Sequence, residues 1–344
     1  MLIGPRGVGK TALLKSLAET ARLDGIIPAL VEIRSDGGGL EELLLRLKEV
    51  LCTLDFRSKV KAGIQEAFSI LGGFIKRFAV HVGDVGVEIE PRSEGLVTGN
   101  IELDLSQLLL SVARVARDSD TAIGLYIDEL QNLDAQALSG VIIALHHAAQ
   151  DLLPLYLIGS GLPTLRSLIG KSKTYAERMF VYEEIGALDR ESAGCAIRSP
   201  LEEKGIEIEE TALDGIFAFS RGYPFFIQTC GYQVWQQADS SPITAMHVAD
   251  VLPAAREQLD RSFFDVRFDR ISPGERKFLR AMSEAGTQAT MSFIAAELNR
   301  SVNSLSMVRK ALLKKGMIYS PSIGTVSYTV PMFDEYIKRV MPEL

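Results

Sequence analysis

The chain has 344 residues, of which 47% are hydrophobic and 24% charged, a composition typical of globular proteins rather than disordered ones. Its formal net charge of −7 excludes a global basic field for nucleic acid, so such binding would need a local patch. The three cysteines form no C-x-x-C pair and indicate neither a zinc site nor a disulfide framework. No apolar run reaches the roughly 18 residues of a membrane span, and the N-terminus lacks the pattern of a secretion signal. We therefore expect a cytoplasmic protein that does not contact a membrane.

A phosphate-binding loop is predicted near the N-terminus, where residues 4–11 fit the pattern G-x-x-x-x-G-K-[ST] at every constrained position. Its glycines let the backbone curl so that several N–H groups point at one anionic centre. An apolar strand at residues 1–3 precedes the loop, and a segment with helical periodicity follows it. We expect Lys10 to reach the β- and γ-phosphates of a nucleoside triphosphate and Thr11 to bind Mg²⁺. The predicted nucleotide-binding residues here are Gly4, Pro5, Arg6, Gly7, Val8, Gly9, Lys10, Thr11 and Ala12.

Strand and helix patterns alternate through the first half of the chain. Strands are predicted at 26–33, 122–127, 155–158 and 180–185, and helices at 40–51, 103–116, 135–149 and 162–169. Such alternation predicts an α/β fold with a parallel sheet covered by helices on both faces. Residues from about 56 to 100, which include a helical pattern and two short strand-like runs, are interpreted as an insertion.

Two acidic residues end the apolar strand at 122–127. Because open α/β sheets place ligands at the carboxyl ends of their strands, we expect Asp128 to hold Mg²⁺ and Glu129 to act as the general base that polarises the attacking water. A strand that simply ends in solvated acids is the alternative. Ser160 comes just past the strand at 155–158, where it would orient the water or touch the γ-phosphate, or be an ordinary loop serine.

The strands stop beyond residue 186, and three helical patterns at 190–204, 210–220 and 225–238 predict a small helical domain. The last segment begins with a helix at 273–282, opened by Ser272 with Glu275 in the capping-box position. Helices at 292–298 and 303–315 and strands at 317–320 and 326–330 follow. This order is typical of a winged helix-turn-helix.

The third of these helices is basic and carries no acidic residue. From Ser272 to Leu344 the chain has ten Lys/Arg against six Asp/Glu, so this segment is the local basic patch. Cations there suit the phosphates of duplex DNA. Two alternatives remain: lysines at the end of a helix complement its dipole, and winged helices also dock proteins. The candidate DNA contacts are Arg309, Lys310, Lys314 and Lys315.

Together, the loop, the Asp-Glu strand, the helical segment and the winged-helix pattern resemble the AAA+ ATPases, particularly their initiator-like and STAND-related branch, over nearly the whole chain. The resemblance implies an ATPase core at 1–185, a helical lid at 186–270 and a winged helix-turn-helix at 271–344. It also implies an arginine finger at Arg178, for which a surface ion pair is the alternative, and an adenine-side lid motif that ends at Pro224. No sensor-2 arginine is obvious, since Arg221 lies one residue before that motif. In the family an initial segment that contacts adenine precedes the first strand, whereas here the loop begins at the fourth residue. We therefore expect a truncated chain, a misassigned start or a reduced affinity for nucleotide.

Three functions are compatible with these patterns. The first is an AAA+ ATPase that binds ATP or ADP with Mg²⁺ and couples hydrolysis to a winged helix on DNA, with a homo-oligomer expected if Arg178 acts in trans. The second is a STAND-like regulatory scaffold in which nucleotide exchange matters more than turnover and the winged helix docks a protein. A small-molecule kinase is disfavoured, because Glu129 suits attack by water.

Overall fold

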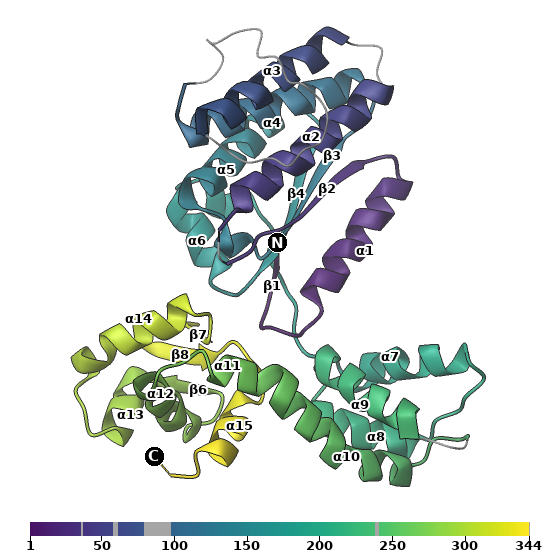
Figure 1. The fold of residues 1–344 in the computed structure, drawn as a ribbon, viewed down its shortest axis with the longest axis vertical. Helices are drawn as coiled ribbons and strands as arrows, with labels where there is room; N and C mark the ends of the chain where they lie inside the picture. The colour runs from purple at the N-terminus through teal and green to yellow at the C-terminus, as the bar shows by residue number, and fades with distance from the viewer. Residues whose placement is uncertain (36, 58–60, 79–97, 238–240, 344) are drawn as a thin grey trace. The chain divides into compact units, whose positions relative to one another are not determined.

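The structure is a computed structural model that describes residues 1–35, 37–57, 61–78, 98–237 and 241–343. The chain forms two compact units (Figure 1). The first unit comprises Met1–Ile3 and Lys10–Glu184, and the second comprises Gly4–Gly9 and Ile185–Leu344. Among the helices within these described ranges, none is long and apolar enough to cross a membrane.

The first unit is built on a five-stranded parallel sheet with strand order β2-β3-β4-β1-β5. Parallel neighbours require crossover connections, which the alternating helices supply. Because β1 lies beside β4 and β4 beside β3, the carboxyl ends of these three strands meet at one edge. The strands are β1 (Leu2–Ile3), β2 (Ile27–Glu32), β3 (Ile123–Asp128), β4 (Leu155–Gly161) and β5 (Glu183–Glu184).

Helices cover both faces of this sheet, as predicted. Figure 1 shows α1 on one side of the sheet and α2 to α5 on the other. Leucines of α2 and α4 at helical spacing are fully buried in the core between these layers, because each helix turns one apolar stripe inward. The helices are α1 (Lys10–Leu23), α2 (Gly39–Arg57), α3 (Lys61–Phe78), α4 (Ile101–Asp118), α5 (Ala135–Gln150) and α6 (Leu165–Ser172).

The predicted insertion at about 56–100 is described only in part. Its first portion contains the end of α2 and the whole of α3, which packs against α4 in the core of the first unit. The two short strand-like runs expected after α3 fall at 79–97, outside the described residues. Elsewhere, β5 is shorter than the strand predicted at 180–185, and β4 extends to Gly161, three residues beyond its predicted end.

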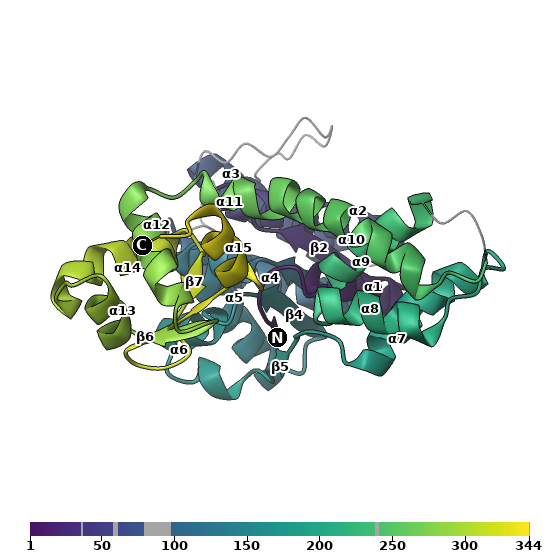
Figure 2. The ribbon, with the colours of Figure 1, turned by 90° about the horizontal axis from the view of Figure 1, so that it is seen from below.

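Most of the second unit is helical, and its last part contains a small antiparallel sheet. Figure 2 shows α7 to α10 gathered at one end of this unit and α12 to α15 at the other. A continuous helical run links them, consisting of α10, a π-helical turn at Asp260–Asp265 and α11. The first helices are α7 (Arg190–Glu202), α8 (Glu210–Ser220), α9 (Pro224–Gln237), α10 (Ala245–Leu259) and α11 (Val266–Phe268).

The last part of the second unit has the element order α12-β6-α13-α14-β7-β8-α15, with sheet order β6-β8-β7. The capping box predicted at Ser272 and Glu275 opens α12. The sequence patterns did not identify β6 or α15. The elements are α12 (Pro273–Ser283), β6 (Gln288–Thr290), α13 (Met291–Glu297), α14 (Ser306–Lys314), β7 (Ile318–Tyr319), β8 (Thr325–Tyr328) and α15 (Phe333–Val340).

An aromatic cluster ties the two ends of the second unit together. The Phe226 ring of α9 meets Phe263 and Phe264 of the π-helical turn, with ring centroids 5.5 and 5.9 Å away. Phe264 in turn stacks on Tyr336 of α15 at 5.0 Å. Each of these pairs contributes about 0.5–1.5 kcal/mol beyond its buried area. The cluster therefore joins the helical segment and the C-terminal segment in one hydrophobic core.

Candidate functional site

Three polar side chains converge at the carboxyl edge of the parallel sheet. Asp128 ends β3 and is 3% exposed, Ser160 lies on β4 and is fully buried, and Thr11 stands in the first turn of α1. The Thr11 Oγ1 hydroxyl donates to Asp128 Oδ2 at 2.5 Å, and the Ser160 Oγ hydroxyl donates to Asp128 Oδ1. The backbone N–H of Glu129 also donates to Asp128 Oδ1, at 2.9 Å. The carboxylate is thus held by three donors from three different elements.

These contacts follow from the strand order. Because β4 lies between β1 and β3, a side chain near the end of β4 reaches the acid at the end of β3. The hydroxyl of Ser160 is directed to this carboxylate from within the strand, not from the loop beyond it as expected. Thr11 and Asp128 also line a cavity of about 400 Å³, together with residues of α1, β2 and α2.

The predicted phosphate-binding loop joins β1 to α1. Gly7 and Gly9 have positive φ values of 82° and 90°, in the left-handed region that glycine favours. Lys10 begins α1 and is 6% exposed, whereas Thr11 and Ala12 after it are exposed. The intervening Pro5 and Arg6 are half-buried, and Val8 is buried.

Close backbone contacts inside the second unit explain why a side chain does not fit at two positions, Gly4 and Gly222. A Cβ atom at Gly4 would lie 2.0 Å from the carbonyl oxygen of Ile185, so no side chain fits there. Gly222, with φ of 76°, would place a Cβ atom 2.0 Å from the carbonyl oxygen of Leu188. Pro224 begins α9, and the N–H of the next residue, Phe225, donates to the Gly7 carbonyl at 3.3 Å. The predicted lid motif thus lies next to the loop through its backbone.

The donor set at the sheet edge fits Mg²⁺. This ion prefers oxygen ligands and is usually bound by one or two protein groups together with substrate phosphates and water. The Asp128 carboxylate and the Thr11 hydroxyl supply such oxygens from adjacent positions. Within the described residues there is no group of three or more His, Cys, Asp or Glu side chains that would form an all-protein metal site. The arrangement therefore suits a metal that arrives with a phosphate ligand.

Glu129 follows Asp128 with a left-handed backbone, φ 51° and ψ 38°, which turns the chain sharply out of β3. Its Oε2 atom accepts a hydrogen bond from Gln131 Nε2 at 2.5 Å. Gln131 Oε1 in turn accepts from the backbone N–H of Leu162 at 3.1 Å. Sequence reasoning did not identify Gln131, although a polar amide two residues after an Asp-Glu pair was a visible signal.

The predicted finger lies in the first unit, between α6 and β5. Arg178 ends a short 3₁₀ turn at Ala176–Arg178 and is exposed. Its guanidinium makes no ion pair or hydrogen bond with any residue of the described ranges, so the alternative of a surface ion pair is not observed. Arg221, considered for the sensor-2 position, has a left-handed backbone and pairs with Glu335 of α15.

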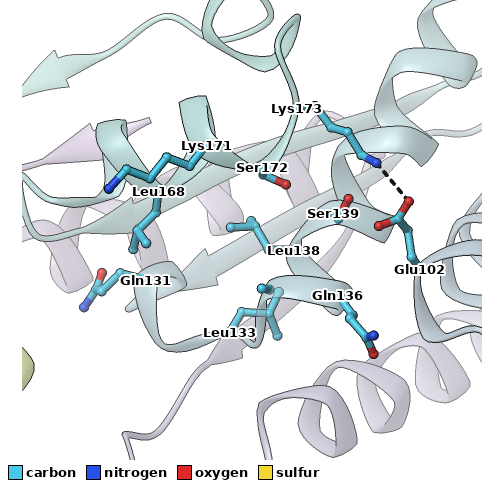
Figure 3. Close-up of a pocket in the computed structure, with 11 residues that line it drawn as sticks. Glu102, Gln131, Leu133, Gln136, Leu138, Ser139, Leu168, Lys171, Ser172 and Lys173 are labelled. Atoms are coloured by element: carbon cyan, nitrogen blue, oxygen red, sulfur yellow. Dashed lines mark hydrogen bonds and ion pairs between the residues drawn. The ribbon is translucent and has the colours of Figure 1, made fainter.

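A second cavity, of about 530 Å³, is lined by Gln131 and by residues of α4, α5 and α6 (Figure 3). Lys173 Nζ donates to Glu102 Oε1 at 2.9 Å across one end of it. The hydrogen bond from the Lys173 ammonium lowers the pKa of the Glu102 carboxyl, against the effect of burial. The amide of Gln131 lines the opposite end. The sequence patterns gave no sign of this cavity, because its lining comes from four separate segments.

The four cations predicted to contact DNA have different surroundings. Lys315 Nζ donates to Glu275 Oε2 at 2.7 Å and to the Arg270 carbonyl at 2.9 Å, so it stabilises the start of α12. Arg309 donates to the Ser320 hydroxyl at 2.7 Å. Lys310 and Lys314 are exposed, and neither has an ion pair within the part of the chain that the structure describes. Two of the four cations are therefore available to an external anion.

Comparisons with known proteins agree with the topology. A family described as a domain of unknown function, DUF8462, matches residues 261–337, and no curated protein matches the sequence. The structure is similar to that of a Walker-type ATPase from Pyrococcus abyssi, with 16% identity, a TM-score of 0.59 and coverage of 98% of this chain and 90% of that one. It also matches a Thermotoga maritima RuvB mutant (16% identity, TM-score 0.45, coverage 98% and 86%). A third match is Aeropyrum pernix Orc1 in complex with DNA (12%, TM-score 0.44, coverage 99% and 86%).

Three features agree with the similarity to the Walker-type ATPase. They are the parallel sheet with strand order β2-β3-β4-β1-β5, the glycine loop directly after β1, and the Asp-Glu pair at the end of β3. The chain therefore has the fold of that Walker-type ATPase, a P-loop arrangement on a parallel sheet.

Proposed function

We propose that this chain is an ATPase that binds Mg-ATP at the carboxyl edge of its parallel sheet and hydrolyses it. The observation that carries the proposal is the convergence of the Thr11 and Ser160 hydroxyls on the buried Asp128 carboxylate. Burying a carboxylate costs free energy unless hydrogen bonds or a cation compensate for the lost water. The Asp128 carboxylate is 3% exposed and accepts from three donors, as expected of a group prepared to bind a cation. The adjacent glycine loop and the start of α1 supply backbone N–H groups for phosphates.

In this mechanism each residue has a separate task. The loop amides and Lys10 would neutralise the phosphates, while Thr11 and Asp128 would hold Mg²⁺, which would supply further neutralisation of the phosphate charge. Glu129 accepts a proton from the attacking water, and Ser160 keeps the Asp128 carboxylate oriented. Pro224, the first residue of α9, is a further proposed nucleotide contact. Positioning and electrostatics supply most of the rate in phosphoryl transfer, so fixed side chains at this edge suit the reaction.

The test is steady-state ATP turnover of the wild type beside Lys10→Ala, Glu129→Gln and the matched control Glu183→Gln on the exposed strand β5. We expect Lys10→Ala to lose nucleotide binding, Glu129→Gln to bind ATP but hydrolyse it only at a low, measurable residual rate, and Glu183→Gln to behave as wild type. Turnover by Glu129→Gln at the wild-type rate would refute the assignment of the base. Failure of the wild type to bind Mg-ATP would refute the proposed function.

Arg178 is proposed as an arginine finger that completes the site of a second copy of the chain. Its exposure and its lack of a partner among the described residues support this role. Turnover per chain should then rise with protein concentration, and Arg178→Ala should abolish that rise. Adding the Lys10→Ala variant, which still carries Arg178, should restore turnover to Arg178→Ala but not to Glu129→Gln. Turnover per chain that does not depend on concentration would exclude a finger in trans.

The C-terminal segment is proposed to be a winged helix that binds duplex DNA. The element order α12-β6-α13-α14-β7-β8 and the exposed cations Lys310 and Lys314 of α14 support this role. The double substitution Lys310→Glu and Lys314→Glu should weaken binding and reduce the slope of log K against log salt by about 2, since each phosphate contact contributes roughly 0.9. The exposed Lys204→Glu in the helical segment is the control.

A regulatory scaffold whose winged helix docks a protein is the second candidate function. It is favoured by the pairing of Lys315 and Arg309 inside the segment, which leaves a modest basic patch. Slow turnover unaffected by mixed-sequence duplex DNA, together with no measurable DNA binding at 50 mM salt, would support the scaffold over the DNA-coupled ATPase.

A further inference from the structure

The Gln131 side chain bridges the ends of two neighbouring strands. Its Nε2 group donates to the Glu129 carboxylate at 2.5 Å, and its Oε1 atom accepts from the Leu162 N–H at 3.1 Å. Glu129 directly follows β3, and Leu162 directly follows β4. Both ends of the amide are therefore used, one on the proposed base and one on the strand that carries Ser160.

The surrounding backbone leaves little freedom to this amide. A Cβ atom at Gly161 would lie 2.2 Å from Gln131 Oε1 and 3.4 Å from its Cδ atom, so the amide packs directly on the backbone of β4. Gln131 itself lies in a 3₁₀ turn at Leu130–Asn132, which begins after the left-handed Glu129. A second hydrogen bond fixes the last residue of this turn, because Asn132 Nδ2 donates to the Ile33 carbonyl at 3.0 Å.

Charge and geometry make Gln131 suited to hold a carboxylate. A hydrogen bond to an ionised acceptor is about twice as strong as one between neutral groups. A glutamate side chain has three rotatable bonds, and fixing it in one rotamer costs free energy that an additional donor offsets. Glu129 is only half-buried, so packing alone does not fix its side chain.

We propose that Gln131 is a positioning residue that holds the Glu129 carboxylate for attack by water and couples it to the end of β4. The proposal rests on the function proposed above, in which Glu129 is the base. Because Ser160 on β4 binds Asp128 and Leu162 on the same segment binds Gln131, one strand end fixes both acids. A displacement of β4 would therefore move the metal-holding carboxylate and the base together.

The amide also forms part of the wall of the cavity in Figure 3. Gln136 lines the same cavity and is exposed on the first turn of α5. Among the described residues, the side-chain hydrogen bond to the Glu129 carboxylate comes from Gln131 and not from Gln136. Gln136 offers a matched control of the same residue type. Substitution of Gln136 perturbs the cavity wall without touching the proposed base.

The experiment compares Gln131→Leu, Gln131→Asn and Gln136→Leu in two backgrounds, wild type and Glu129→Gln. We expect Gln131→Leu to lower kcat about tenfold to a hundredfold, as for the loss of alignment of a reacting group, with KM for ATP and the Kd of Mg-ATP within about twofold. Gln131→Asn should be intermediate, and Gln136→Leu should match the wild type. In the Glu129→Gln background, Gln131→Leu should cause no further loss, because residues that act as a unit are not additive.

Each other outcome overturns the proposal in an identifiable way. An equal loss in both backgrounds, or a loss accompanied by weaker Mg-ATP binding, would show that Gln131 acts through the fold and not through Glu129. A higher kcat of Gln131→Leu would show that the bond restrains the base in an unproductive position. If Glu129→Gln abolishes turnover while Gln131→Leu does not lower it, only the positioning role fails. If Glu129→Gln itself retains full turnover, the proposed function fails first.

Discussion

Removal of the Ser160 hydroxyl tests the organisation of the site without nucleotide. In Ser160→Ala the buried Asp128 carboxylate loses one of three donors and keeps those of Thr11 and the Glu129 N–H. A hydrogen bond to a charged group contributes about 1.5–3 kcal/mol, and the carboxylate left behind is largely buried. We therefore expect the free energy of unfolding of the first unit to fall by about 1.5–3 kcal/mol, equivalent to a decrease in Tm of roughly 3–10 °C.

Thermal unfolding followed by far-UV circular dichroism measures this change in nucleotide-free protein. The only tryptophan of the sequence, Trp235, belongs to the second unit, so its fluorescence reports that unit separately. Ser119→Ala is the control, because the Ser119 hydroxyl is buried without a hydrogen-bond partner among the described residues and its removal should cost nothing. Repeating Ser160→Ala in an Asp128→Asn background isolates the pairwise interaction.

Two results would refute this reasoning. If Ser160→Ala unfolds at the wild-type temperature, the hydroxyl does not contribute to the stability of the site. If the loss is as large in the Asp128→Asn background, it comes from packing of β4 and not from the charged hydrogen bond. A lower Tm together with weaker Mg-ATP binding would support a site that is organised before the nucleotide arrives.

Three further predictions concern the second unit. Gly222→Ala should destabilise the protein by more than about 1 kcal/mol because its positive φ and the nearby carbonyl exclude a side chain, whereas Gly231→Ala, with open space around it, should be neutral or stabilising in thermal unfolding. Burial opposes ionisation of the Glu275 carboxyl, but hydrogen bonds from the Lys315 ammonium and from Ser272 at the helix cap outweigh burial and lower the pKa of this carboxyl. The stability that the ionised carboxylate contributes should therefore be present above about pH 4.5 and be lost as the pH falls through the folded-state pKa. Unfolding of Glu275→Gln and wild type should therefore differ at pH 7 and converge below pH 4.5; a constant difference would contradict this. Burial raises the pKa of the Cys230 thiol to about 12, so at pH 8 a thiol reagent should modify the exposed Cys195 and leave Cys230 intact until unfolding, and equal rates would disprove the burial argument.

Local patterns in the sequence were sufficient for much of the first unit. The glycine loop needs particular backbone angles at particular positions, so Gly7 and Gly9 identify it without knowledge of the fold. The periodicity of apolar residues distinguishes strands from helices and shows which face of each is buried. Regular alternation of the two predicts a parallel sheet covered by helices. The same logic placed Asp128 and Glu129 at the carboxyl edge of a strand.

The sequence was less informative where structure depends on partners far along the chain. Strand β6 has three residues, too few for a period to be visible, and it forms through pairing with β8. Ser160 was expected beyond its strand, but β4 continues to Gly161 because β1 pairs with those residues. Lys315 was counted with the exposed cations, whereas the structure pairs it with Glu275, 40 residues away.

By itself, then, the sequence predicted which residues would carry chemistry and placed Asp128 and Glu129 at the carboxyl end of a strand, since both inferences depend only on local spacing. Only the tertiary structure decided which of these groups meet. The hydrogen bonds from Thr11 and Ser160 to Asp128, and the bridge from Gln131 to Glu129 and Leu162, span 117, 32, 2 and 31 positions. Three of these four separations exceed the reach of any helical or strand period, so strand order and packing had to bring the partners together.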